Sequence, residues 1–170
     1  MERTITFYLL NNLSLVLLIL ALIFASFSAR KNKQLTDNRE VFDIFAGYIF
    51  FFNVGIFCIW LFIINFVMAT AIADFLGWGA IPFRTEDIAF NLGLGILGLM
   101  AIRESFGFRL ATLIMTTCAF WGHALQYGNA LMLDAHYQLG WFLPKSSFFV
   151  MVLVPILLII LMGASKKEKN

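Results

Sequence analysis

The fold of this chain is decided by residues 82–129, which read PFRTEDIAFNLGLGILGLMAIRESFGFRLATLIMTTCAFWGHALQYGN. The stretch contains two apolar runs, residues 88–102 and 110–133, joined by a short turn that carries Arg103, Glu104 and Arg109. Apolar runs separated by charged turns are typical of helices that pass through a membrane. The same stretch holds most of the polar side chains that interrupt apolar sequence in this protein.

The composition of the whole chain agrees with this interpretation. Of its 170 residues 61% are hydrophobic and only 13% are charged, whereas about a quarter are charged in an average soluble domain. The formal net charge of +2 and the lack of a basic, aromatic groove argue against nucleic-acid binding. We expect the lipid bilayer to be the main partner, and residues 1–170 to form a single transmembrane domain.

Five helices are predicted. They cover about residues 4–29, 44–73, 85–103, 109–133 and 146–165. A membrane span needs about 20 apolar residues, and only the third apolar run falls short of that length. It is completed by Thr85 as an N-cap, followed by Glu86 and Asp87 in the first turn, where acidic groups suit the helix dipole. The predicted fold class is therefore all-α, an integral membrane bundle of five transmembrane helices.

Lysine and arginine set the expected orientation, because they concentrate in cytoplasmic loops. Nine of the 12 basic residues fall on one side of a five-span topology and three on the other. The nine are Arg30, Lys31, Lys33, Arg39, Arg103, Arg109, Lys166, Lys167 and Lys169. The sequence thus predicts that the N-terminus lies outside and the C-terminus in the cytoplasm.

The third predicted helix carries closely spaced small residues. Gly93, Gly95 and Gly98 match the GxGxxG pattern of dinucleotide-binding folds, but that pattern requires a preceding strand, which an apolar helix does not provide. Small residues three or four apart instead allow a second helix backbone to approach closely. Ala89 with Gly93, and Gly95 with Gly98, are the candidates for such a contact.

Polar side chains on three helices are expected at similar depth in the outer half of the membrane. We call this set the polar layer; its members are Asn65, Glu86, Asp87, Asn91, His123 and Gln126. Ionisable groups inside a membrane are costly and favour a functional role, whereas Asn, Gln and His also form structural hydrogen bonds between helices. Both interpretations stay open. Geometry favours Asp87 as the inward-facing acid, since it shares a helix face with Asn91.

Catalytic and metal chemistry have less support. His123 is the only histidine within a predicted span, and no HxxxH, HExxH or Glu-x-x-His pair accompanies it, so a dedicated metal site lacks ligands. A metal ion held by His123 with Glu86 or Asp87 remains an alternative. No catalytic residue, metal ligand set or cofactor is assigned, and an enzymatic role is not favoured.

Part of this stretch resembles a known family. Pro82-Phe83, Glu86, Asn91-Leu92, the run Gly95 to Leu99 and Trp121-Gly122-His123 are similar to motifs in a family of small bacterial inner-membrane proteins of unknown function. The resemblance implies a multi-pass fold in the bacterial inner membrane and draws attention to Glu86, Asn91 and His123. Asp87 and the Arg84-Thr85 pair depart from the pattern.

The function expected first is that of a membrane protein that binds or passes a small solute, ion or proton at the polar layer. An accessory or structural subunit of a larger membrane complex is the alternative, supported by the small size and the glycine-rich helix. A membrane-embedded enzyme that acts on a lipid or quinone, with His123 and an acid as a proton-transfer pair, is a third. Because one small copy has little room for a solvent-filled path, we expect a homo-oligomer or a partner subunit.

Overall fold

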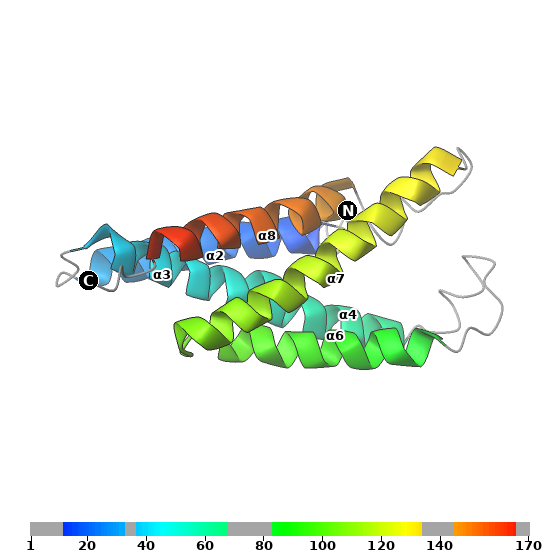
Figure 1. Ribbon diagram of the computed structural model, residues 1–170, viewed down its shortest axis with the longest axis horizontal. Coiled ribbons are helices and arrows are strands. Elements are labelled where there is room, and N and C mark those ends of the chain that lie inside the picture. Colours follow the sequence, from blue (N-terminus) through cyan, green and yellow to red (C-terminus); the bar gives the residue numbers. More distant parts are fainter. Residues whose placement is uncertain (1–11, 33–36, 68–82, 134–144, 166–170) are drawn as a thin grey trace, which may run out of the picture.

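The computed structural model describes residues 12–32, 37–67, 83–133 and 145–165, without the side chains of 83–85, 87, 126–133 and 145–147. Within these ranges the chain is all-helical and has no strand (Figure 1). Five helices are formed by α2 (Leu13–Lys31), the continuous α3–η1–α4 (Asn38–Ile49, Phe50–Ile56 and Phe57–Val67), α6 (Phe83–Met100), α7 (Phe106–Leu133) and α8 (Lys145–Ser165). The all-α prediction is confirmed.

Three helical segments are long and apolar enough to cross a membrane. They are Leu13–Lys31, Asn38–Val67 and Phe148–Ser165. The apolar part of α6, Ile88–Met100, is shorter. The described helices therefore fit a membrane protein, while the number of five spans and the orientation stay predictions.

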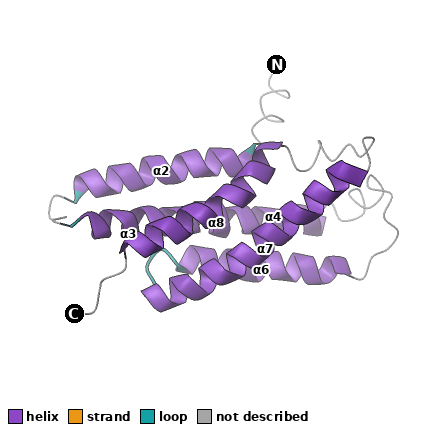
Figure 2. Cartoon of the chain, turned by 45° about the horizontal axis from the view of Figure 1, so that its top comes forward, coloured by secondary structure: helices purple, strands orange, loops and turns teal. Residues whose placement is uncertain are grey.

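Consecutive helices run in opposite directions and form two groups. The helices α2, α3 and α8 lie side by side, and α6 packs along η1 and α4 (Figures 1 and 2). The helix α7 crosses at an angle and packs chiefly against α8. One buried core joins the groups; Phe57 of α4, for example, meets Phe120 of α7 edge to face with ring centroids 6.2 Å apart.

The closest approach of two helices lies between α6 and η1. A Cβ atom added to Gly98 would lie 2.4 Å from the backbone nitrogen of Gly55. One added to Gly95 would lie 3.0 Å from the backbone nitrogen of Ile59 and closer still to that side chain. The prediction of a tight contact is therefore confirmed for Gly95 and Gly98. Gly93 is exposed, and no atom of the described residues lies within 4 Å of its Cβ position, so the Ala89–Gly93 pair makes no such contact within the described part of the chain.

The second helix is not uniformly α-helical. Its central seven residues, Phe50–Ile56, form a π-helix, a rare geometry that appears mostly as short interruptions of α-helices. Asn53 lies in this segment, buried at 1% exposure, and its Nδ2 donates to the carbonyl oxygen of Ser14 on α2 at 3.0 Å. Its Oδ1 is buried without a hydrogen-bond partner.

Gly98→Ala is expected to lower the free energy of unfolding by about 1–3 kcal/mol, because the new methyl group meets backbone that cannot move aside easily. Gly93→Ala, on the same helix, is the matched control. It should be neutral or stabilising by up to about 1 kcal/mol, since alanine costs less backbone entropy in a helix. Denaturant unfolding of the detergent-solubilised protein, followed by circular dichroism, measures both. Equal effects of the two substitutions would contradict the contact.

Candidate functional site

The most completely bonded polar group in the described part of the chain is Arg109, in the first turn of α7. The turn before it is set by Ser105, whose Oγ accepts from the backbone nitrogen of Phe108 at 3.5 Å, the N-cap arrangement that starts many helices. This start places Arg109 beside the end of α6. Its side chain is only 7% exposed.

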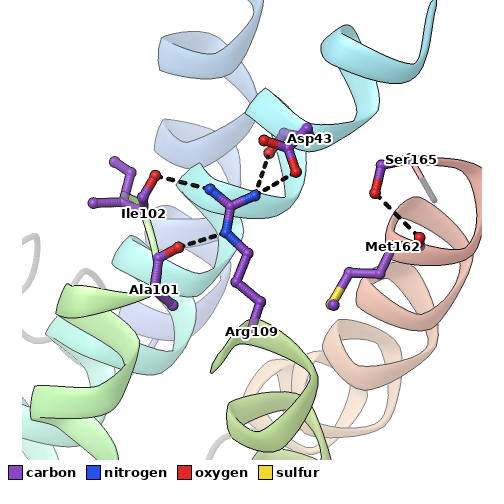
Figure 3. Close-up of polar contacts among 6 residues, drawn as sticks. All are labelled: Asp43, Ala101, Ile102, Arg109, Met162 and Ser165. Atoms are coloured by element: carbon purple, nitrogen blue, oxygen red, sulfur yellow. Dashed lines mark hydrogen bonds and ion pairs between the residues drawn. The ribbon is translucent and has the colours of Figure 1, made fainter. Parts of the chain in front are cut away.

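All three guanidinium nitrogens of Arg109 donate hydrogen bonds (Figure 3). Nε donates to the carbonyl of Ala101 at 2.6 Å, and one terminal nitrogen donates to the carbonyl of Ile102 at 2.9 Å. The other terminal nitrogen donates to the Oδ1 and the backbone carbonyl of Asp43 on α3. We call Arg109 with these acceptors the arginine clamp.

The arginine clamp provides hydrogen-bond donors for carbonyl groups at the end of a helix. The last carbonyls of a helix have no partner within it, and here those following α6 lie against α3 rather than in open water. Gly47 of α3 lies beside these groups, since a Cβ atom added there would be in ordinary contact, 3.4 Å from the Ile102 oxygen and 3.5 Å from the guanidinium. With every nitrogen engaged, the guanidinium joins α3, α6 and α7 and is not available to a ligand.

Sequence analysis missed this role and counted Arg109 as a loop charge. The available signal was positional: Asp43 and Arg109 each stand directly before an apolar run, and both runs start from the same side. Opposite charges at equal depth on two helices are candidates for an ion pair. The carbonyl acceptors could not be identified in this way, because every residue carries one.

The polar layer is only partly covered by described side chains. Asn91 on α6 is buried at 3% exposure, Asn65 on α4 and His123 on α7 are half-buried, and Glu86 in the first turn of α6 is exposed. Asp87 and Gln126 belong to α6 and α7, but their side chains lie outside the described residues. That these six residues form one site stays a prediction.

Helix register places three members of the layer around α4. Gly98 meets Gly55 and Gly95 meets Ile59, so Asn91, one turn from Gly95 on the same face, lies opposite the next turn of α4. His123 follows Phe120 by one turn, on the α7 side that contacts Phe57.

Asn65 lies about one turn farther along α4 than the point opposite Asn91. It is also turned about 120° around the axis from Ile59, since the two residues are six positions apart at about 100° each. The side chains of Asn65, Asn91 and His123 therefore lie within about 8 Å of one another along the α4 axis. They differ in their directions around that axis. Within the described part of the chain, no three His, Cys, Asp or Glu side chains are placed to share a metal ion.

The two ends of α7 differ in how they meet the other helices. Near Arg109 the helix is held to α3 and α6, whereas toward its C-terminal end it diverges from α6 in both views (Figures 1 and 2) and from α4 in Figure 1. Two threonines between these ends are buried, and their hydroxyls donate to carbonyls one turn earlier, Thr112 to Phe108 and Thr116 to Thr112. These hydroxyls need no other partner. His123 follows them, on the part of α7 that leads to the divergent end.

Arg109→Met is expected to lower the free energy of unfolding by about 3–5 kcal/mol. The substitution keeps much of the aliphatic part of the side chain but removes every hydrogen-bond donor. Asp43→Asn should cost only about 1 kcal/mol, because the Asp43 side chain is 53% exposed and its backbone carbonyl remains an acceptor. Arg39→Met, at an exposed ion pair with Asp37, is the control and should be near neutral. Denaturant unfolding in detergent ranks the three variants, and an Arg109 variant as stable as the control would contradict the clamp.

Comparison with known proteins assigns the chain to a family without assigning it an activity. No curated protein and no solved structure matches it. The resemblance to an uncharacterised family is confirmed at that level, while its bacterial source and its motifs stay predictions. A family model matches residues 11–170, nearly the whole sequence, and the chain therefore belongs to DUF6790, a family of unknown function.

Proposed function

We propose that this protein spans the membrane five times, with its N-terminus outside and its C-terminus in the cytoplasm. The distribution of charge along the bundle supports this. The described basic residues at the end where α2 stops and α3 and α7 start are Arg30, Lys31, Arg39, Arg103 and Arg109. One of them, Arg109, is largely buried and paired, but the remaining four still mark this end as cytoplasmic by the positive-inside rule.

We further propose that the polar layer between α4, α6 and α7 binds or passes a small solute, with a cation or proton as the favoured class. The observation that carries the proposal is Asn91. This amide is buried on the face of α6 that packs on α4, at the depth where α4 and α7 carry Asn65 and His123. Amide oxygens and a neutral imidazole nitrogen are acceptors that suit a cation or a proton.

The carboxylates of Glu86 and Asp87 would add negative charge toward the outer end of this layer. Glu86 is exposed in the first turn of α6, where it is free to attract cations from the outer surface. The divergence of α7 from α4 and α6 lies on the same side of the molecule (Figure 1).

The alternative that this protein is an accessory subunit of a membrane complex is no longer supported by the glycine-rich helix. It drew on the glycine-rich face of α6 as a surface for another protein, but Gly95 and Gly98 pack against η1 and α4 of the same chain. Gly93 is exposed, and its position alone does not make a tight contact surface.

Labelling with a membrane-impermeant maleimide in intact cells tests the orientation. In a background with Cys58 and Cys118 replaced by Ala, Glu86→Cys is expected to react from outside, and Lys31→Cys only after the membrane is permeabilised. Both positions are exposed, so folding is a minor concern. The reverse pattern would overturn the proposed topology.

Proteoliposome flux tests the polar layer. Liposomes that contain the protein and a dye sensitive to H⁺, Na⁺ or K⁺, each with the matching ion gradient imposed, should show flux that falls at least about tenfold in Asn91→Leu and His123→Phe. Thr117→Val is the matched control, because the Thr117 hydroxyl donates only within α7, to the Leu113 carbonyl at 2.8 Å. If the two layer variants conduct like the control, or if no gradient drives flux through the parent protein, the proposal fails.

A further inference from the structure

A second site is indicated at the opposite end of the molecule from the polar layer. A groove of about 620 Å³ lies between α2, the junction of α3 with η1, and the end of α6. We call it the aromatic groove. The residues used below line it: Phe24, Tyr48, Phe51, Phe52, Arg103 and Glu104.

Stacked rings form one wall of the aromatic groove. Phe24 of α2 stacks on Phe52 with centroids 5.5 Å apart, and both rings stack with Tyr48 at 6.4 and 6.5 Å. Phe51 stands edge-on to Phe52 at 5.2 Å. Although the rings contact one another, Phe24 remains 47% exposed. The wall is therefore a preformed apolar surface that one further apolar chain can cover.

The rings extend from the charged end of the bundle toward the membrane interior. Gly47 contacts the carbonyl of Ile102 and Gly55 contacts Leu99, so Tyr48 lies level with the turn between α6 and α7. Phe52 lies one helical turn deeper. An apolar chain that follows the rings thus starts at the membrane surface and runs inward.

Two opposite charges stand where the groove meets this turn. Arg103 and Glu104 are both exposed, and neither forms an ion pair with any residue that the structure describes. This distinguishes Arg103 from Arg109, whose nitrogens are all bonded. A neighbouring cation and anion, both unpaired, complement a head group that carries one anion and one cation.

We propose that the aromatic groove binds one phospholipid of the cytoplasmic leaflet whose head group combines a phosphate with a primary ammonium, as in phosphatidylethanolamine. One acyl chain lies along the stacked rings. The phosphate accepts hydrogen bonds from Arg103, and the ammonium donates to Glu104.

The charge pattern selects this head group over two common alternatives. An anionic phosphatidylglycerol satisfies Arg103 but brings no donor with positive charge to Glu104. A phosphatidylcholine carries a quaternary ammonium, which has no N–H to donate. A second copy of the chain seated on the groove would have to bury both charges, which is costly without matched partners.

Native mass spectrometry of the full-length protein, titrated with each of the three lipids at identical acyl chains, tests the proposal. The parent protein is expected to bind one phosphatidylethanolamine about fivefold to tenfold more tightly than either other lipid. Glu104→Gln should remove the preference over phosphatidylglycerol. Arg103→Gln should weaken all three lipids by a similar factor, because each has a phosphate. Arg30→Gln, at an exposed cation in the last turn of α2 outside the groove, is the control and should bind like the parent.

Two results would overturn the proposal. Equal affinities of the parent protein for the three lipids would show ordinary contact with the bilayer. Loss of lipid binding as the protein dimerises, with the dimer weakened by Phe24→Ala, would show that a second copy occupies the groove. All four substituted side chains are exposed or partly exposed, and circular dichroism of each variant confirms that folding is unchanged.

Discussion

The arginine clamp is the interaction on which the arrangement of the helices depends. A helix that ends against other helices leaves carbonyl groups without water, and the end of α6 meets this condition against α3. One guanidinium satisfies two of these carbonyls and an acid on a third helix, which few other side chains can do because the planar fork presents five donors. Gly47 of α3 lies next to the same carbonyl and guanidinium.

The sequence predicted those features that follow from spacing and composition. Helical class and the packing of Gly95 and Gly98 follow from apolar runs and from small residues at helical intervals. The pattern could not show which of the two small faces on α6 meets a partner, because both Ala89–Gly93 and Gly95–Gly98 fit the same rule. Only the antiparallel register against Gly55 and Ile59 decides it.

Other features leave no trace in a single sequence. The π-helix lies in the run Phe50–Ile56, where Gly55 is the residue that most disfavours a regular helix, and the sequence pattern does not distinguish a π-helix from an α-helix there. The depth of the polar layer was derivable by counting residues from the helix ends. The directions of its side chains around α4 were not, because they depend on how α6 and α7 are placed about it. The carbonyl partners of Arg109 were hidden for the same reason, whereas the position of Asp43 before an apolar run carried a signal.

The proposed solute site and the proposed lipid site lie at opposite ends of the bundle. They differ in the interactions by which each would bind its ligand. The polar layer relies on amide and imidazole groups on three helices, of which Asn91 is buried. The aromatic groove relies on exposed charges beside preformed apolar rings. The close backbone contact of α6 with η1 lies between the two.

The arginine clamp fixes the start of α7 to α3 and α6, so that the helix, which packs chiefly against α8 along its length, compares with a lever. The helix has 28 residues, or about 42 Å at 1.5 Å per residue, with its pivot at the arginine clamp and its far end directed away from α4 and α6. His123 stands 14 residues beyond Arg109, or about 21 Å along the axis. A rotation of about 5° at the pivot would therefore move His123 by about 2 Å, a displacement comparable to the helix shifts that switch other proteins between states.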